Sequence, residues 1–333
     1  MEGKNRIAIW DNLRFILIFL VVLGHFADYY TKQSVNMRIL FLFIYAFHMP
    51  TFIFVSGLFS KRAVAQKDYR KVFEYFVLYL FTKIFLFCMR MIGTGSIGSF
   101  SLFAEGGVPW FAFALAVFLL ITMALQKLDK RYLFLFSVTL ACFAGYDNNI
   151  NARLALSRII VFYPFFLAGY YMDATKLLCY FKQKKMMVVS VLALIGIVIV
   201  SNCCINRIYW IRPLLTGQNP FESLGDYYKW GILLRAGCYL MSFLLIFITI
   251  SLTPQKSGVI SRWGQRSLQV YVLHYGFVYL FFGILDGEKW VNKIFGGRHI
   301  WIVFVSLFVT IVFSQKFWWK LLEPFIKPKW NEN

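Results

Sequence analysis

The sequence predicts an all-α protein that crosses a membrane many times. Of its 333 residues, 60% are hydrophobic and 20% aromatic, and only 15% are charged. Soluble domains usually carry about 25% charged residues, and the apolar residues here gather in runs long enough to cross a hydrocarbon core of about 30 Å. These two observations indicate a polytopic membrane protein, with lipids as its immediate surroundings.

Ten apolar runs can be placed along the chain, so the sequence predicts about ten transmembrane helices. They lie near residues 7 to 27, 39 to 60, 72 to 92, 108 to 126, 131 to 146, 157 to 175, 186 to 205, 230 to 252, 266 to 285 and 300 to 321. We expect one helical membrane domain over residues 1–333, with no appended soluble domain, low-complexity segment or internal repeat.

The positive charges predict the orientation of these helices. A net charge of +20 would suggest nucleic acid for a soluble domain, but the charges here lie between the apolar runs, and no nucleic-acid partner is expected. Alternate connections hold 21 of the 35 basic residues, which places these connections and both termini in the cytoplasm. These residues are Lys4, Arg6, Lys61, Arg62, Lys67, Arg70, Lys71, Lys127, Lys130, Arg131, Lys176, Lys182, Lys184, Lys185, Lys256, Arg262, Arg266, Lys316, Lys320, Lys327 and Lys329. The opposite connections include a long polar and aromatic stretch, 206 to 229, which could cover a site or contact a sugar.

The first apolar run carries Arg14 and His25 within the segment WDNLRFILIFLVVLGH. Eleven helical positions bring the two side chains to within roughly 20° of one another, about 16 Å apart along the axis. Asp11 lies three residues before Arg14, close enough to pair with it. A structural histidine and an arginine that reaches the headgroups would explain each residue singly. The aligned set favours function, because ionisable groups inside a membrane are costly.

The second run, FHMPTFIFVSGLFSKR, ends in a basic cluster. Pro50 removes one backbone hydrogen bond and predicts a kink, and the pair Ser56-Gly57 allows a neighbouring helix to approach closely. The basic residues that follow are explained by topology alone. The alternative is a cytoplasmic seat for a phosphate-bearing donor, for which Lys67 and Arg70 are best placed.

Four further residues stand out along the chain. Trp110 begins a helix in VPWFAFAL, as an interfacial tryptophan anchor does. Arg158, beside Ser157 at the outer end of its helix, suits contact with either lipid headgroups or substrate. His274 lies about 12 Å into the ninth run, where a structural role with Tyr271 and Tyr275 as partners is expected.

The histidines do not predict a metal site. They stand at positions 25, 48, 274 and 299, without metal-ligand spacing. No metal is therefore expected.

Taken together, these motifs resemble the acyltransferase 3 family of integral-membrane acyltransferases, in particular its fucose 4-O-acetylase-like branch. WDNLRFILIFLVVLGH resembles the family's first-helix motif, and FHMPTFIFVSG its second. KDYR stands where the family often has two arginines three apart, with Lys67 in place of the first. VPWFAFAL, SRIIVFYPFFLAGYY and GQRSLQVYVLH are similar to later family segments.

The resemblance implies transfer of an acyl group, usually acetyl, from acyl-CoA to a carbohydrate hydroxyl. His25 would be catalytic with Arg14 and Asp11, while Lys67, Arg70 and Trp110 would bind the donor. Substrate would contact Ser157, Arg158, His48 and His274. Acetyl-CoA would be a co-substrate rather than a bound cofactor, and the acceptor a surface polysaccharide or its lipid-linked precursor, at the inner membrane of a bacterium.

Two other functions are compatible with the same residues. Many spans with buried charge suit a transporter or flippase of a lipid-linked sugar, although such proteins often show repeats. The third possibility is a cytoplasm-facing acyltransferase that acts on a small metabolite. His25 could act as a general base or carry the acyl group covalently, and the sequence leaves both open.

Overall fold

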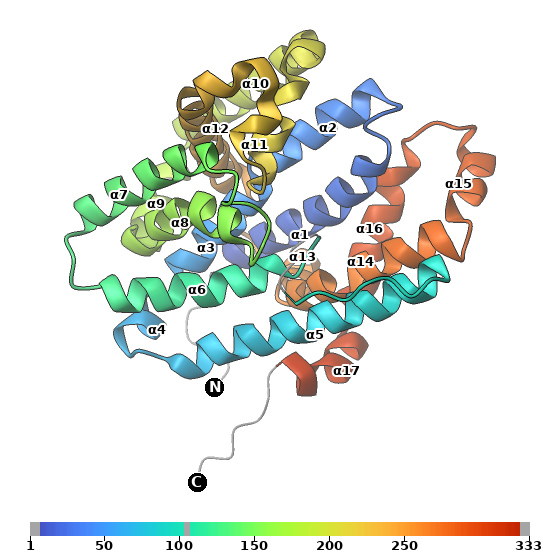
Figure 1. Cartoon of the computed structure of the whole chain (residues 1–333), viewed down its shortest axis with the longest axis horizontal. Coiled ribbons are helices and arrows are strands. Elements are labelled where there is room, and N and C mark those ends of the chain that lie inside the picture. The colour runs from blue at the N-terminus through green and yellow to red at the C-terminus, as the bar shows by residue number, and fades with distance from the viewer. Residues whose placement is uncertain (1–6, 103–106, 327–333) are drawn as a thin grey trace. The chain divides into compact units, whose positions relative to one another are not determined.

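The structure is a computed structural model that describes residues 7–102 and 107–326, and these residues form helices without a strand (Figure 1). The chain divides into two compact units that interleave in sequence. Unit 1 comprises residues 1–37, 80–101 and 253–333, and unit 2 comprises residues 38–79 and 102–252. Each unit is described by itself, and the prediction of a single domain remains a prediction.

Unit 1 is built around helix α1, which packs against α13, α14 and α16 (Figure 1). Asp11 in the first turn of α1 suits the positive end of the helix dipole. The residues of α1 between Ile9 and Ala27 are largely buried, because neighbours cover most of its faces. The helices of the unit are α1 (Ala8–Tyr29), the end of α5 (Tyr69–Thr94), α13 (Val259–Gly264), α14 (Ser267–Gly283), α15 (Gly287–Phe295), α16 (Trp301–Phe313) and α17 (Lys316–Ile326).

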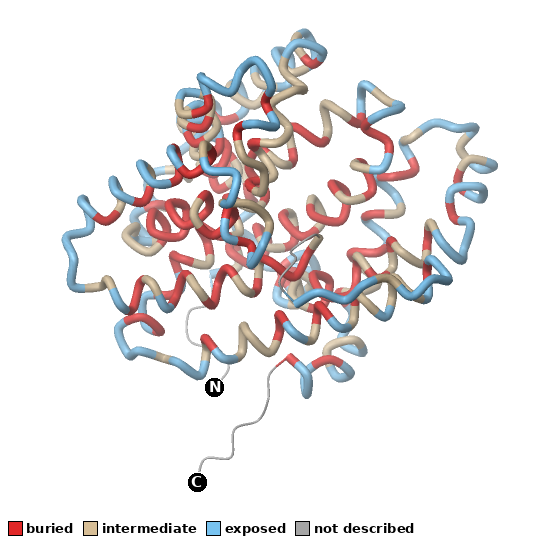
Figure 2. Tube along the Cα trace, viewed as in Figure 1, coloured by how far each residue is buried: buried red, intermediate tan, exposed pale blue. Residues whose placement is uncertain are grey.

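Unit 2 has α8 at its centre, packed against α3, α6 and α7. Twelve residues of α8 from Ser157 to Gly169 are buried (Figure 2). By contrast, only Ser190 and Ile205 of α10 are buried, so its apolar surface suits contact with lipid. The elements of the unit are most of α2 (Val35–Tyr45), α3 (His48–Leu58), α4 (Lys61–Ala65), the start of α5, α6 (Trp110–Leu125), α7 (Lys130–Phe143), η1 (Ala144–Tyr146), α8 (Leu156–Tyr171), α9 (Ala174–Phe181), α10 (Lys184–Ile208), η2 (Tyr209–Ile211), α11 (Arg212–Thr216), η3 (Phe221–Trp230) and α12 (Gly231–Leu252).

The contact between α3 and α8 depends on two glycines. A Cβ at Gly57 would lie 2.0 Å from the carbonyl oxygen of Phe166, and one at Gly169 would lie 1.9 Å from that of Phe54. Either methyl group would force the helices apart, because real Cβ atoms do not approach so closely. The close approach predicted at Ser56-Gly57 is therefore confirmed.

The break predicted from Pro50 is also present, and it lies one turn earlier than the proline. Helix α2 ends at Tyr45 and α3 begins at His48, which places Pro50 in the first turn of α3. Pro50 has no N–H to donate to the Ala46 carbonyl, and that carbonyl instead accepts a hydrogen bond of 2.6 Å from Ser242 Oγ. The Ala46 carbonyl, which has no N–H of Pro50 to accept from, thus links α12 to the break between α2 and α3.

The helices long and apolar enough to cross a membrane are fewer than predicted. Five qualify among the described residues, and seven if each of two bent pairs counts as one span. Helices α6, α7 and α8 have 16, 14 and 16 residues, shorter than the roughly 20 that a span normally needs. The number ten and the cytoplasmic termini remain predictions, and Lys4, Arg6, Lys327 and Lys329 lie outside the described residues.

The outer stretch predicted as a loop, 206 to 229, is largely helical. Helix α10 continues to Ile208, and η2, α11 and η3 follow. Gly217 ends α11 with φ +67°, a conformation that glycine adopts without strain. The chain therefore turns sharply there, and residues 216–218 contact α8 of the same unit.

Candidate active site

In unit 1, one uninterrupted helix carries the three residues predicted to be catalytic. Asp11 is 2% exposed, and its Oδ1 lies 3.5 Å from Arg14 Nη1, so the two pair as their spacing predicts. Gln265 Nε2 donates to the other carboxylate oxygen of Asp11 at 3.1 Å. The carboxylate is thus held on both sides, while the Arg14 side chain remains 32% exposed.

The side chain of Asn12, next to Asp11, holds the start of α1 against residues 254–261. Asn12 Nδ2 donates to the carbonyl groups of Pro254 and Lys256, at 2.8 and 3.0 Å, and Asn12 Oδ1 accepts from Ser261 Oγ at 2.7 Å. These bonds join the start of α1 to residues 254–261, which include the first turn of α13, across some 240 residues of sequence.

A glycine completes this contact. A Cβ at Gly264 would lie 1.8 Å from the Asp11 carbonyl oxygen. Only glycine therefore lets α13 approach α1 so closely, and Gln265 follows it directly in sequence. The close approach brings the Gln265 amide within reach of the Asp11 carboxylate.

A second imidazole, that of His274 in α14, lies next to His25. The ring centroids of His25 and His274 lie 5.3 Å apart with an interplanar angle of 32°. The ring of Tyr275 meets His25 edge-on, with centroids 4.7 Å apart. His25 is half-buried and His274 is fully buried. The structure therefore groups His25, His274 and Tyr275, with Tyr275 contacting both imidazoles.

The hydrogen bond of His274 shows which of its two ring nitrogens carries the hydrogen. Nδ1 lies 2.8 Å from the Val270 carbonyl oxygen, and since a carbonyl only accepts, Nδ1 carries the hydrogen. In the neutral ring, Nε2 then has a lone pair. This nitrogen is buried and has no hydrogen-bond partner among the described residues. His274 therefore supplies an unused proton acceptor close to His25.

In unit 2, the two cations predicted to bind the donor are exposed. Lys67 lies in the turn between α4 and α5 with φ +49°, and Arg70 lies in the first turn of α5. Lys67 thus precedes the helix that carries Arg70. Neither side chain makes a hydrogen bond or ion pair within the part of the chain that the structure describes, so both can reach a ligand.

Trp110 is buried rather than placed as an interfacial anchor. It is 6% exposed, and its ring stacks on Phe162 with centroids 5.3 Å apart. The Arg158 guanidinium carbon lies 4.7 Å from the centre of the Trp110 ring. The structure therefore brings Trp110 to Arg158, and the tryptophan face is occupied by protein.

Arg158 and Ser157 bind the returning segment after α11. Arg158 Nε donates to the Thr216 carbonyl at 3.2 Å and Nη2 to Gln218 Oε1 at 2.7 Å. Ser157 Oγ donates to the Gly217 carbonyl at 2.8 Å. The sequence suggested lipid headgroups or substrate as contacts of Arg158, whereas the structure buries it and gives it protein partners.

His48, in the first turn of α3, shares the local geometry of His274. Its Nδ1 lies 2.7 Å from the Ile44 carbonyl oxygen, and the residue is 4% exposed. Its ring neighbour is Tyr45, with centroids 4.9 Å apart. Within unit 2, His48 is thus a buried histidine beside a phenol.

The sequence analysis missed two polar residues. Gln265 precedes the ninth apolar run and holds Asp11, and Arg235 lies buried within the eighth. An arginine inside the run from 230 to 252 was a detectable signal, since intramembrane charges are rare. No group of three or more His, Cys, Asp or Glu residues that could hold a metal ion occurs in the described ranges.

Comparison with known proteins adds one finding. A family model described as an acyltransferase domain, Acyl_transf_3, matches residues 7–319. No curated protein and no solved structure matches the chain.

Proposed function

Because the chain belongs to the acyltransferase 3 family, whose model matches residues 7–319, we propose that it transfers an acetyl group from acetyl-CoA to a sugar hydroxyl. The acceptor is a surface polysaccharide or its lipid-linked precursor, as in the fucose 4-O-acetylase-like branch that the motifs resemble. The proposed location is the inner membrane of a bacterium. Family membership supports membrane acyltransferase activity, while the donor, the acceptor and the membrane are part of the proposal.

The observation that carries this function is the grouping of His25 with His274 and Tyr275. An imidazole takes and returns protons near neutral pH, as acyl transfer from a thioester to a hydroxyl requires. A second imidazole with an unused acceptor nitrogen, 5.3 Å away between centroids, can receive a proton or hold a hydroxyl. The side chains of His25 in α1 and of His274 and Tyr275 in α14 thus form a small polar centre inside unit 1.

His25 acts in this proposal as the general base. It takes the proton of the acceptor hydroxyl as the oxygen attacks the thioester carbonyl, a carbon–oxygen bond forms, and the carbon–sulfur bond breaks. The departing thiolate takes the proton from the imidazolium and leaves as free CoA. In the covalent route, an imidazole nitrogen of His25 attacks the thioester carbonyl, the carbon–sulfur bond breaks, and CoA leaves as the thiol with the N–H proton of the imidazole. The acceptor hydroxyl then attacks the acetyl-imidazole, the carbon–nitrogen bond breaks, and the hydroxyl proton passes to the released imidazole.

Arg14 supplies positive charge in the same unit. Asp11 holds one side of the Arg14 guanidinium and itself accepts a hydrogen bond from Gln265. The exposed part of the guanidinium can pair with an anionic portion of the donor. Lys67 and Arg70 are the proposed partners of the CoA phosphates, because exposed cations without protein partners bind polyanions readily.

Three of the residues proposed for the acceptor, Ser157, Arg158 and His48, lie in unit 2, and the fourth, His274, lies in unit 1. Ser157 and Arg158 fix residues 216–218, so they act on the acceptor by holding the outer segment in place. Trp110 supports Arg158, whose guanidinium carbon lies over the Trp110 ring. His48 contacts the acceptor through its Nε2, because its Nδ1 is hydrogen-bonded to the Ile44 carbonyl.

The proposal is tested with purified protein in detergent, acetyl-CoA and the host glycan or its lipid-linked precursor. We expect release of free CoA thiol that depends on acceptor, and an added acetyl mass on the glycan. Both should be lost in a stably folded His25→Ala variant. Unchanged acetylation in that variant would exclude His25 as the catalytic residue.

The same preparation separates the alternative functions. Reconstituted protein that moved a lipid-linked sugar across vesicles without consuming acetyl-CoA would be a transporter. Label from acetyl-CoA retained on the protein in the absence of acceptor would favour the covalent route over general-base catalysis.

A further inference from the structure

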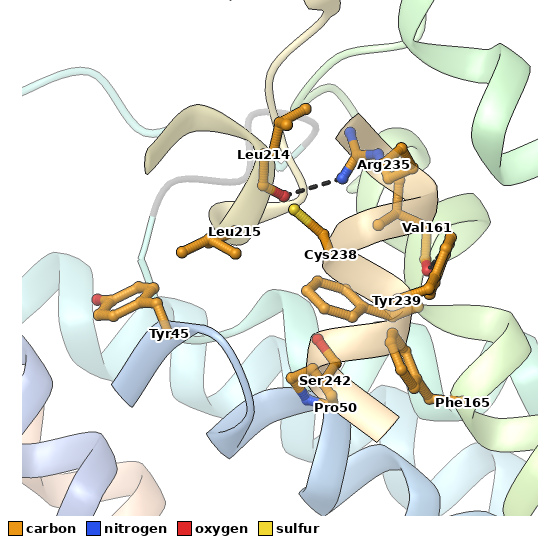
Figure 3. Close-up of a pocket in the computed structure, with 11 residues that line it drawn as sticks. Tyr45, Pro50, Val161, Phe165, Leu214, Leu215, Arg235, Cys238, Tyr239 and Ser242 are labelled. Carbon is orange, nitrogen blue, oxygen red and sulfur yellow. Dashed lines mark hydrogen bonds between the residues drawn. The ribbon is translucent and has the colours of Figure 1, made fainter. Parts of the chain in front are cut away.

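Unit 2 contains a small cavity between α2, α3, α8, α11 and α12 (Figure 3). The enclosed space that a water-sized group can occupy is about 20 Å³, and about 270 Å³ is empty when the open solvent at the mouth is included. Most of its lining is apolar and comes from Pro50, Val161, Phe162, Phe165, Leu214 and Leu215. The remaining lining residues are Tyr45, Arg235, Cys238, Tyr239 and Ser242.

Two hydroxyl groups in this lining are already used by the protein. Tyr239 Oη donates to the Val161 carbonyl at 2.6 Å, and Ser242 Oγ donates to the Ala46 carbonyl at 2.6 Å. Both hydrogen bonds join helices of the same unit. Arg235 is therefore the lining residue with polar groups left to satisfy and the one that carries charge.

Arg235 is 2% exposed and makes one side-chain hydrogen bond to the described residues. Nη1 donates to the Leu214 carbonyl at 2.8 Å (Figure 3), and the guanidinium carbon lies 5.5 Å from the centre of the Phe221 ring. Nε and Nη2 are buried and have no hydrogen-bond partner among the described residues. No acidic side chain in these residues pairs with Arg235.

A buried guanidinium in this condition is costly to the folded protein. Removing a charge from water carries a large penalty, which only a counter-charge or a full set of hydrogen bonds offsets. The two unused N–H groups lie on one edge of the guanidinium plane, the edge that binds both oxygens of a carboxylate or phosphate side-on. An oxyanion is a partner that fits this edge.

We propose that this cavity binds an amphiphilic oxyanion, a carboxylate or phosphate group joined to an apolar chain. The acid group pairs with Nε and Nη2 of Arg235, which turns toward the cavity as the ligand enters, because both atoms are shielded in the empty arrangement. The apolar chain contacts Phe162, Phe165 and Leu215. The enclosed space of about 20 Å³ is little more than one water needs, so only the acid group enters it and the apolar chain lies in the mouth.

This site is independent of the proposed transfer reaction, because its residues lie outside those assigned to the donor, the acceptor and the catalytic centre. Its ligand is either a fatty acid or an anionic lipid of the membrane. Both share the same chemistry at Arg235, and they differ in whether the acid is a carboxylate or a phosphate.

The test is thermal unfolding of the full chain in a non-ionic detergent with four probes. The probes are decanoate, dioctanoyl phosphatidic acid, decanol and inorganic phosphate. A ligand that binds the folded state raises the Tm as its concentration exceeds Kd. We expect a rise with decanoate or phosphatidic acid and none with decanol or phosphate. The acid that acts at the lower concentration identifies the source. No response to either amphiphile, or an equal response to phosphate alone, would overturn the proposal.

Three variants locate the response. Arg235→Met should abolish it without lowering the ligand-free Tm, because the variant removes an unpaired buried charge. Arg235→Lys should weaken binding at least tenfold, because lysine lacks the planar fork. Arg212→Met is the matched control, a half-buried arginine of the same unit outside the cavity lining, and should keep the response. If Arg235→Met does not fold, Leu215→Trp tests the site by filling the cavity while retaining the charge. A wild-type response in Arg235→Met, or in Leu215→Trp, would refute the site.

Discussion

His274 in unit 1 and His48 in unit 2 share a local structure and differ in their neighbours. Each is buried in a helix, and each places Nδ1 near the carbonyl oxygen four residues earlier, at 2.8 and 2.7 Å. His274 lies beside a second imidazole, His25, whereas His48 lies beside the phenol of Tyr45. Burial and the backbone hydrogen bond are thus common to both, and the chemistry of the adjacent ring distinguishes them.

The cations of the two units differ in a related way. Arg14 pairs with one buried carboxylate and remains partly exposed. Arg158 lies over Trp110 and donates to Thr216 and Gln218. The first arrangement leaves charge for a ligand, and the second uses charge to hold a segment of the chain. The contrast holds for these two arginines, since unit 2 also carries the exposed cations Lys67 and Arg70.

The largest effect should follow from His25→Ala. Loss of a general base typically reduces rate about 10²–10⁴-fold, so we expect a fall in kcat of that size with an unchanged Tm. The measurement is acceptor-dependent release of CoA thiol. His299→Ala, another half-buried histidine of unit 1, is the control. Equal losses in the two variants would mean that the assay reports general damage to the unit.

The second prediction compares the two buried histidines directly. His274→Asn should lower the rate of transfer at least about tenfold more than His48→Asn, because only His274 can exchange a proton near His25. Thermal stability should change by similar amounts, since each variant disturbs one backbone hydrogen bond. A larger loss of transfer at His48 would reverse the assignment of roles to the two units.

Two glycine substitutions should separate stability from chemistry. Gly57→Ala and Gly264→Ala each place a methyl group within 2.0 Å of a backbone oxygen, and overpacking of this kind costs about 1–3 kcal/mol. Only Gly264→Ala moves the Gln265 amide relative to Asp11, so only this variant should also reduce kcat in the protein that remains folded. Equal kcat values per folded molecule would contradict a role for the Asp11 contact.

The smallest effect should come from the exposed cations of unit 2. Arg70→Gln should raise KM for acetyl-CoA several-fold and leave kcat nearly unchanged, because it removes a contact to phosphate that is equal in ground and transition states. Added salt should reduce the difference between variant and wild type. A change in kcat alone would assign Arg70 to the reaction instead of to donor binding.

Much of the first helix could be predicted from the sequence. The expected span from 7 to 27 corresponds to Ala8–Tyr29, and the pairing of Asp11 with Arg14 follows from helical spacing. The break near Pro50 and the close approach at Gly57 follow equally from the properties of single residues. Such features depend on neighbours within one or two turns, which a sequence displays directly.

The partners of these helices could not be predicted, because periodicity does not say which helices pack together. His274 reaches His25 from about 250 residues away. Arg158 was expected at the outer end of its helix, in contact with lipid headgroups or substrate, and it is buried because Gly217 turns the chain back over it. Arg235 escaped notice although its charge inside an apolar run was visible, since no motif drew attention to it.

The most direct test of the imidazole pair as the reaction centre is a double-mutant cycle between His25 and His274, measured as the single-turnover rate of acetyl transfer. Residues that act as a unit show strongly non-additive losses. We predict that His274→Asn costs at least tenfold in the wild-type background and almost nothing once His25 is alanine. Equal costs of His274→Asn in both backgrounds would contradict the pairing and place the chemistry elsewhere in the chain.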